Sequence, residues 1–246
     1  MKILVIGESC EDVFNYCRVD RLAPDVPAPV CNSLYTEKNK GMAGNVFNNI
    51  KSFNIDCDLI TNKNKSIKTR YIDESCNYTL LRLDEHDESE PFDFDFFIKK
   101  DLKQYNAIII SDYNKGFLTP EDIFKISNSH PLTFLDTKKY LSDWCENISF
   151  IKLNNSEYQK NLNFLSTAPF VLEKVIKTRG RHGCSFNGKN YPTEDVLIKD
   201  VSGAGDTFIS CLAIEYCKSN DIVLAINFAQ KCTTKVVQKQ GVSTPE

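Results

Sequence analysis

Short runs of apolar and β-branched residues recur along the chain and predict strands buried within a sheet. Six runs of four or five residues show this pattern. They cover residues 2–6, 57–61, 107–111, 133–136, 150–153 and 175–178. Such runs are typical of parallel strands that are covered on both faces.

Segments with helical spacing of apolar residues lie between several of these runs. Residues 119–127 begin with a threonine cap followed by Pro120, which favours a helix start. Further helical patterns cover residues 155–165, 206–217 and 221–238. Strands that alternate with helices predict an α/β fold, with a mostly parallel sheet between helical layers.

Two regions depart from this rhythm. Residues 13–36 are rich in β-formers and prolines, and residues 68–84 alternate between apolar and polar positions. Both predict exposed antiparallel strands that form a small sheet, or lid, beside the main body. The acidic stretch 84–95 predicts a solvated loop, with a metal site as the alternative interpretation.

Composition narrows the class of protein. The chain has 246 residues, of which 41% are hydrophobic and 26% charged, which suits one large globular domain with a sizeable core. Its formal net charge of −3 provides no broad basic field for nucleic acid. Ten cysteines are scattered without C-x-x-C spacing, and they indicate buried thiols in a reducing compartment.

Targeting signals also bear on the location of the protein. The N-terminus opens directly into a strand and turns acidic too soon for a signal peptide. Apolar runs are too short to span a membrane. We therefore expect a cytoplasmic protein without membrane or nucleic-acid partners.

The segment from Asp200 to Asp206 carries the clearest chemical signal. Gly203, Ala204 and Gly205 can turn tightly just before an apolar helix, so that backbone N–H groups and the helix dipole form an anion hole. Asp206 stands at its rim, where a carboxylate can take a proton from an attacking hydroxyl. The alternative is an ordinary strand-to-helix turn with an aspartate cap.

Several motifs in order resemble the ribokinase-like (PfkB) family of carbohydrate kinases, most closely its D-glycero-D-manno-heptose 7-phosphate kinase branch. Residues 200–206 resemble the family signature D-T-G-A-G-D, and residues 21–30 resemble R-I-S-P-E-A-P-V-P-V of that branch. The other matching segments are 41–46, 68–70, 80–84, 111–116, 136–138, 154–157 and 178–183. Each motif alone is weak, whereas all of them in family order over nearly the whole chain are specific.

The resemblance implies a single kinase domain over residues 1–246, with a three-layer αβα ribokinase-like fold and a small β-lid. It implies that Asp206 is the catalytic base and that Gly203, Ala204 and Gly205 form the anion hole. The lid would consist of residues 13–36 and 68–84.

Ligand contacts follow from the same resemblance. It implies sugar contacts at the following positions: Asp12, Gly41, Asn45 and Arg70. ATP would lie against Thr178, Arg179, Gly180, Gly183 and Gly241. Asn154 and Glu157 match the motif that organises Mg²⁺, and their oxygen ligands suit that ion through water.

Charged residues near strand ends support parts of this assignment independently. Arg82 and Lys115 are cations suited to a sugar phosphate, and Lys68 is a weaker candidate. Asp112 and Asp136 lie at the carboxyl ends of predicted strands, where α/β folds bind ligands. For Lys138, a substrate contact is implied by the resemblance of residues 136–138 to the family's D-P-K. For each cation the alternative is a solvated surface position, and for each aspartate it is a loop cap.

Two features depart from the family pattern. Met42 stands where the family usually has a second glycine, and that glycine pair is associated with lid movement. The side chain of Met42 restricts the backbone at this position. Between Asn45 and Lys68 the chain lacks a helix and a strand that related kinases insert. A non-catalytic relative that binds sugar or nucleotide is therefore an alternative hypothesis.

The sequence predicts an ATP- and Mg²⁺-dependent sugar kinase. If the resemblance to the heptose 7-phosphate kinase branch extends to the substrate, the acceptor is the anomeric hydroxyl of heptose 7-phosphate. The product is then the 1,7-bisphosphate, and the pathway leads to surface polysaccharide. A kinase of another sugar or of a nucleoside is the second alternative. Hydride transfer and serine hydrolysis are disfavoured, because neither the dinucleotide fingerprint nor G-x-S-x-G occurs.

The sequence also leads to expectations about oligomeric state and about further domains. Apolar lid residues such as Val13, Phe14, Tyr16 and Val30 favour a homodimer through the lid, with packing within their own sheet as the alternative. We expect no fused nucleotidyltransferase domain of the kind found in some heptose kinases.

Overall fold

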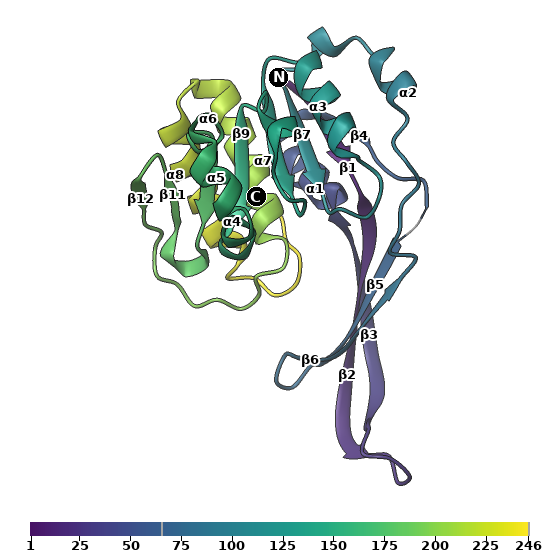
Figure 1. Ribbon diagram of the computed structural model, residues 1–246. Helices are drawn as coiled ribbons and strands as arrows, with labels where there is room; N and C mark the ends of the chain where they lie inside the picture. Colours follow the sequence, from purple (N-terminus) through teal and green to yellow (C-terminus); the bar gives the residue numbers. More distant parts are fainter. Residues whose placement is uncertain (65, 246) are drawn as a thin grey trace.

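A computed structural model describes residues 1–64 and 66–245. Its main body has a central sheet with helices on both faces, and a long, narrow sheet projects from one side (Figure 1). The predicted α/β class, with a mostly parallel central sheet between helical layers, is confirmed.

The central sheet has eight strands in the order β12-β11-β10-β9-β8-β7-β1-β4. The six strands from β10 to β4 run parallel, whereas β11 and β12 are antiparallel additions at one edge. Their bounds are Lys2–Gly7 (β1), Asp56–Ile60 (β4), Ala107–Asp112 (β7), Thr133–Thr137 (β8), Phe150–Asn154 (β9), Val175–Thr178 (β10), Cys184–Phe186 (β11) and Lys189–Tyr191 (β12).

Alternation along the central strands builds two separate cores. Ile3 and Val5 of β1 face one core, and Leu4 and Ile6 face the other, because successive side chains of a strand point to opposite sides. All four are fully buried. Both faces of the sheet are therefore apolar, as the short hydrophobic runs predict.

The first core packs against α1 (Ala43–Ser52), α7 (Ala204–Ser219) and α8 (Ile222–Val236). The second packs against α2 (Phe94–Ile98), α3 (Pro120–Ser129), α5 (Leu162–Thr167) and α6 (Pro169–Leu172). The remaining helical segments are short: α4 (Asn155–Lys160), η1 (Leu102–Gln104), η2 (Asp143–Cys145) and η3 (Gly180–His182). The predicted helix 155–165 is in fact two helices, separated at Asn161.

The projecting sheet, called the small sheet below, has four strands in the order β3-β2-β5-β6. Its strands are β2 (Ser9–Leu22), β3 (Pro29–Met42), β5 (Ser66–Asp73) and β6 (Tyr78–Glu85). The strand β2 pairs antiparallel with β3 and parallel with β5. The strand β2 begins directly after β1. The small sheet therefore extends from the carboxyl end of β1 in the central sheet.

Apolar residues of β2 pack within the chain itself. Phe14 and Tyr16 are 1% and 2% exposed, and they form a cluster with Ile72 and Val242. Val13 is also buried. The expectation that these residues offer an apolar face to a second copy is therefore wrong for Val13, Phe14 and Tyr16.

The small sheet joins the main body at a strained residue. Met42 ends β3 and forms the N-cap of α1 with φ 61° and ψ −132°. This backbone region is unfavourable for a residue with a side chain. The Met42 side chain is nevertheless buried, so packing holds the junction in this conformation.

Among the described residues, none of the helices combines the length and the apolar character that a bilayer crossing requires.

Candidate active site

The Asp206 carboxylate lies buried in the first turn of α7. Its Oδ2 accepts a hydrogen bond of 2.9 Å from Nδ2 of Asn45, and its Oδ1 accepts one of 2.8 Å from the Tyr113 hydroxyl. Burial raises the pKa of Asp206 to about 6, although both hydrogen bonds oppose this shift. A carboxylate with this pKa is ionised at neutral pH and is well matched to accept a proton.

Backbone amides at the start of α7 lie directly beside this carboxylate. Gly203 precedes the helix with φ +76°, and a side chain there would meet Nδ2 of Asn45 at 2.5 Å. The first intrahelical hydrogen bond is donated by the Thr207 amide to the Gly203 carbonyl at 2.9 Å. Ala204 and Gly205 begin this 16-residue helix, whose positive end suits a phosphate group. The Ala204 amide donates to the Val201 carbonyl at 3.2 Å, so this predicted anion-hole donor is already engaged within the chain.

A buried lysine adds positive charge at the same place. Lys152 of β9 pairs with Asp136 of β8 at 2.7 Å, and both side chains are 4% exposed. A side chain at Gly205 would meet the Lys152 ammonium at 2.9 Å. The ammonium therefore lies against the start of α7, where it can neutralise part of a phosphoryl charge.

The loop after β7 is fixed by Glu8, which is 1% exposed. Its carboxylate accepts hydrogen bonds from the backbone amides of Tyr113 at 2.8 Å and Lys115 at 2.9 Å. Glu8 therefore holds the loop in the conformation that brings the Tyr113 hydroxyl to Asp206.

One face of the small sheet carries the basic residues that the sequence analysis singled out. Lys68 of β5 is paired in register with Asp12 of β2 and with Asp84 of β6. Two residues further along, Arg70 is paired with Arg82. Because residues two apart in a strand share a face, all of these side chains lie on one side of the small sheet.

Each arginine on this face is neutralised by a neighbouring aspartate. Arg70 donates to Oδ1 of Asp12 at 2.6 Å, and Arg82 holds both oxygens of Asp84 at 2.7 and 2.8 Å. Gly41 packs tightly on Asp12, since a side chain at Gly41 would meet Oδ2 of Asp12 at 2.2 Å. The structure thus brings the predicted sugar contacts Asp12, Gly41 and Arg70 together, whereas Arg82 stands further out and half-exposed.

Lys115 and Lys68 share a third carboxylate. The Lys115 ammonium forms a hydrogen bond with Oδ2 of Asp87, and Lys68 lies 3.6 Å from Oδ1 of the same residue. Lys68 is also 6.0 Å from the centre of the Tyr113 ring. Lys68 is therefore connected to the Asp206 carboxylate through the side chain of Tyr113.

The carboxylate of Asp112 is bonded to neighbouring residues of the chain and has no oxygen left for a ligand. Its carboxylate is fully buried and accepts hydrogen bonds from the Thr137 hydroxyl, the Lys139 ammonium and the Asn114 amide. These partners use both of its oxygens, which corresponds to the loop-cap interpretation. Asp136, at the end of the adjacent strand, instead faces Lys152 and the start of α7.

Asn154 and Glu157 form a capping box at the start of α4. Oδ1 of Asn154 accepts from the Glu157 amide at 2.9 Å, and Oε2 of Glu157 accepts from the Asn154 amide at 2.7 Å. The remaining oxygen of Glu157 accepts from the ammonium of Lys138. The structure therefore gathers Asn154, Glu157 and Lys138 beside Asp136, which is 3.8 Å from Lys138.

Magnesium fits this corner as a water-coordinated ion. No group of three or more histidine, cysteine or acidic residues lies within metal-binding range of one another in the described part of the chain. Mg²⁺ usually binds one or two carboxylates while keeping its waters and the substrate phosphates. Oδ1 of Asp136 is buried and has no hydrogen-bond partner among the described residues, so this oxygen is open to a water of such an ion. Both oxygens of Glu157 are already hydrogen-bonded, and Glu157 could take part only if the Lys138 ammonium moved away.

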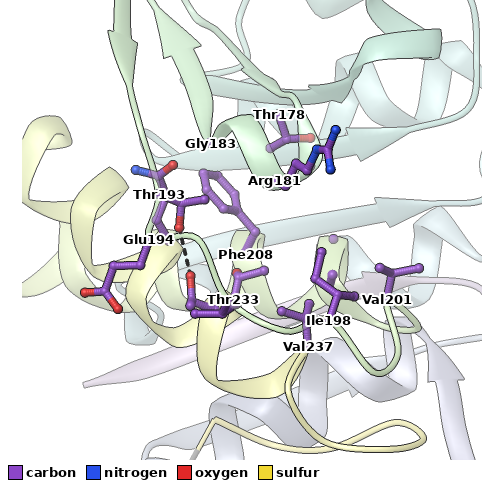
Figure 2. Close-up of a pocket in the computed structure, with 16 residues that line it drawn as sticks. Thr178, Arg181, Gly183, Thr193, Glu194, Ile198, Val201, Phe208, Thr233 and Val237 are labelled. Carbon is purple, nitrogen blue, oxygen red and sulfur yellow. Dashed lines mark hydrogen bonds between the residues drawn. The ribbon is translucent and has the colours of Figure 1, made fainter.

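A cavity of about 190 Å³ lies beside the first turn of α7. Figure 2 shows Thr178 and Arg181 on one side of it, and Ile198, Val201 and Val237 on the other. Ala204 and Gly205 also line it, so the cavity adjoins the turn that carries Asp206. Its walls are predominantly apolar, which suits the flat ring of a nucleobase.

The predicted nucleotide residues divide into two groups. Thr178, Gly180 and Gly183 line the cavity. Arg179 instead donates weakly to the carbonyls of His182 and Cys184, at 3.3 and 3.4 Å, and Arg181 lines the cavity in its place. Gly241 also lies apart from its walls, where its amide donates to Asp200 at 3.1 Å.

Three residues of this site were not singled out from the sequence: Glu8, Tyr113 and Lys152. Tyr113 belongs to a quoted motif, and Lys152 is a lone cation within an apolar run. That isolated charge is a signal that could have identified Lys152 as a paired, buried residue.

Comparison with known proteins adds an independent result. Residues 46–246 match the family described as "pfkB family carbohydrate kinase". The "Bifunctional protein HldE" of Helicobacter pylori (strain J99 / ATCC 700824) is 29% identical over 294 aligned positions. The match covers 98% of this chain but 63% of that protein, so this chain spans less than two thirds of its relative.

Solved structures resemble the whole chain in fold. A nucleoside kinase of Methanocaldococcus jannaschii, an archaeal member of the ribokinase family, superposes with a TM-score of 0.69 and 16% identity. The two chains are covered to 99% and 94%. Arabidopsis thaliana ribokinase, solved with ribose and ATP, gives 0.70 and 11% identity, with 98% and 93% covered.

Proposed function

The chain belongs to the pfkB family of carbohydrate kinases, and we propose that it transfers the γ-phosphoryl group of ATP to a hydroxyl of a phosphorylated sugar. The observation that carries this proposal is the position of Asp206. It lies buried between the cavity beside α7 and the charged face of the small sheet. A base between two such sites can activate an acceptor held on one side towards a donor held on the other.

The reaction begins with removal of the acceptor proton. Asp206 takes the proton of the sugar hydroxyl while that oxygen attacks the γ-phosphorus, and the bond from phosphorus to the ADP oxygen breaks as ADP leaves. Asn45 holds Oδ2 of Asp206 in place. Oδ1, which accepts from Tyr113 in this structure, is the oxygen that the acceptor hydroxyl would approach.

Charge on the transferring group is stabilised by fixed groups of the chain. The amides at the start of α7 and the ammonium of Lys152 lie together at Gly205. Such preorganised groups are worth the most where water is excluded. A magnesium ion, held through water by Asp136 and by Glu157 once Lys138 releases that carboxylate, would neutralise further charge on the ATP phosphates.

ATP would place its base in the cavity between the β10–β11 turn and α8. Thr178 and Gly180 border the end of β10, where the phosphates would pass on their way to Gly205. The cavity and the helix start are contiguous, because Ala204 and Gly205 belong to both. We assign the reaction to the cytoplasm, where ATP is supplied.

We assign the acceptor to the heptose 7-phosphates. The supports are the branch-specific motifs at residues 21–30 and 80–84 and the similarity to the Helicobacter pylori protein. The attacked hydroxyl would be the anomeric one, and the product a heptose 1,7-bisphosphate. A kinase of another sugar or of a nucleoside remains the competing assignment within the family.

A second candidate function is sugar or nucleotide binding without turnover. Met42 favours it, because a strained residue at the junction of the small sheet and α1 restricts movement of that sheet. One assay separates the candidates: ATP turnover with free sugars, sugar phosphates and nucleosides. Turnover confined to phosphorylated sugars supports the first proposal, and binding without turnover supports the second.

A homodimer through the small sheet is part of the proposal. Although the apolar residues of β2 are buried, Leu34 of β3 and Leu81 and Leu83 of β6 are 45%, 56% and 47% exposed. A second copy could cover these side chains by packing sheet on sheet. A mass measurement in solution tests this, and a strict monomer would contradict it.

A further inference from the structure

Asp87 lies between two lysines that come from different parts of the fold. Lys115 of the loop after β7 hydrogen-bonds to its Oδ2, and Lys68 of β5 lies 3.6 Å from its Oδ1. Oδ1 is buried and has no hydrogen-bond partner among the described residues. One carboxylate thus faces two ammonium groups and is well bonded to only one of them.

This arrangement differs from the other ion pairs on the small sheet. Asp12 and Asp84, which neutralise Arg70 and Arg82, are themselves residues of the sheet. Asp87 comes from the acidic loop that follows β6, and its side chain is 30% exposed. It can therefore reach solvent by rotation of its own side chain.

Lys68 cannot leave in the same way, because its side chain is only 7% exposed. A buried ammonium without a counter-charge is strongly unfavourable, so some anion must remain beside it. Its in-register neighbours Asp12 and Asp84 are already bonded to Arg70 and Arg82. Asp87 therefore provides that anion when no ligand is bound. Another anion that pairs better with both lysines can replace it.

We propose that Asp87 holds the place of the substrate's phosphate group, and that a phosphorylated sugar displaces it from Lys68 and Lys115. This inference rests on the proposed function and identifies which residues recognise the phosphate. A phosphate monoester carries about −1.5 to −2 charges and three acceptor oxygens. It therefore matches two ammonium groups better than a single carboxylate does.

The position of the two lysines suits a sugar that spans the site. The Tyr113 ring has Lys68 6.0 Å from its centre, while its hydroxyl bonds to Asp206. A phosphate beside Lys68 is thus connected to the base through the side chain of Tyr113. A sugar with its phosphate at one end could present its opposite end to Asp206.

The exchange needs little backbone movement. The Ser89 amide donates to the Lys115 carbonyl at 2.8 Å, which fixes the loop against the segment after β7. Residues 86–90 also border an open depression of about 940 Å³, together with Asn64. The Asp87 side chain can swing towards this space while its backbone stays in position.

Asp87 would consequently act as a specificity-determining residue. A neutral sugar gains nothing by displacing it, because the lysines would lose their counter-charge. A phosphorylated sugar returns that charge and adds more. The carboxylate competes with phosphate, so its removal should strengthen phosphate binding, whereas loss of an ordinary structural ion pair should weaken the site or leave it unchanged.

The test measures binding of inorganic phosphate by titration calorimetry at fixed ionic strength. The variants are Asp87→Asn, Glu88→Gln and the double variant Asp87→Asn with Lys68→Met. Glu88→Gln is the matched control, because it removes the same charge from an exposed neighbour in the same loop. ATP affinity, measured in parallel, checks the fold at a separate site.

We expect Asp87→Asn to bind phosphate about fivefold more tightly or better, Glu88→Gln to match the parent protein, and the double variant to lose the gain. If Asp87→Asn binds phosphate no more tightly than the parent protein, the proposal is overturned. The same holds if Glu88→Gln gains equally, or if the gain survives Lys68→Met. Lys115→Met in place of Lys68→Met repeats the test at a more exposed residue.

The two proposals fail separately. Phosphate binding concerns Asp87 and the two lysines, whereas turnover concerns Asp206 and the nucleotide cavity. A protein that shows the expected phosphate binding without any turnover would contradict the kinase assignment alone. A protein that turns over sugar phosphates without the Asp87 effect would contradict this inference alone.

Discussion

The hydroxyl of Tyr113 donates a hydrogen bond of 2.8 Å to Oδ1 of Asp206, and it thereby joins the loop after β7 to the first turn of α7. A hydrogen bond donated to an ionised carboxylate favours the charged form and lowers its pKa. Tyr113 therefore opposes the effect of burial, which raises the pKa of Asp206 to about 6.

Tyr113→Phe should move the acidic limb of the pH–rate profile to higher pH. The phenylalanine ring keeps the carboxylate buried but removes the donor, so the pKa of Asp206 rises further above 6. Since Asp206 acts as a base when ionised, activity should be lost at a higher pH as the solution is acidified. The measurement is kcat/KM from pH 5 to 8 for both proteins, and superimposable acidic limbs would contradict the role of Tyr113.

Asp206→Asn should stabilise the folded protein at neutral pH. The folded-state pKa of about 6 lies above the ordinary value of 3.8, so this carboxylate progressively destabilises the fold as pH rises from about 4 through 6. Asparagine removes the charge, and the gain should reach at most about 3 kcal/mol at pH 7. Denaturant unfolding at pH 5 and pH 7 measures it.

The gain from Asp206→Asn should also shrink towards acidic pH, where the aspartate of the parent protein is protonated as well. Asp195→Asn, at an exposed position, is the matched control and should leave stability unchanged. An Asp206→Asn protein that is less stable at pH 7 than the parent would contradict the claim that burial of the ionised carboxylate destabilises the fold.

Met42→Gly should be more stable than Met42→Ala. Both substitutions lose the buried side chain, but only glycine relieves the unfavourable φ of 61° at the N-cap of α1. Strain of this kind costs about 1–3 kcal/mol, so the glycine variant should exceed the alanine variant by about 1 kcal/mol or more. Equal stability in chemical denaturation, or a more stable alanine variant, would refute the strain.

Val237→Trp should block ATP binding. Val237 lines the cavity of about 190 Å³, and an indole there would occupy the space assigned to the nucleobase. We expect the dissociation constant for ATP to rise about tenfold or more, equivalent to about 1.4 kcal/mol. Lys235→Trp, on the exposed side of the same helix, is the control and should bind ATP normally. Equal ATP affinity in both variants would place the base elsewhere.

The fold could be predicted from local pattern to a large extent. The buried runs at β1 and β7 are apolar on both faces, and this pattern alone indicates a central parallel strand. The extent of β2 and β3 could not be predicted in the same way. Their polar outer halves are held by pairing with each other, and strand pairing depends on residues far apart in sequence.

The candidate site shows the same limit. Asp206 and the glycines before it are neighbours in sequence, so their chemistry could be inferred from one motif. Lys152 is paired in register with Asp136 of the adjacent strand, a relation that appears only when the strands assemble. Glu8 likewise acts on amides more than 100 residues away, at Tyr113 and Lys115.

Asp112 illustrates the opposite case. Its place after a buried strand favours a ligand contact, yet Thr137 and Lys139 use its oxygens in the folded chain. A position at the carboxyl end of a strand thus identifies candidate ligand-binding residues. The hydrogen-bond partners in the folded chain show which of these residues are free to bind a ligand. Asp136 follows the next strand and does face the start of α7.

The central claim is that Asp206 is the base of a phosphoryl transfer. The most direct measurement is the initial rate of ADP release from ATP with the best acceptor of the sugar panel, for the parent protein, Asp206→Asn and Asp195→Asn. We predict that Asp206→Asn loses about 10²–10⁴-fold in kcat, with unchanged ATP affinity, while Asp195→Asn keeps the parent rate. A near-parental rate for Asp206→Asn would contradict the account.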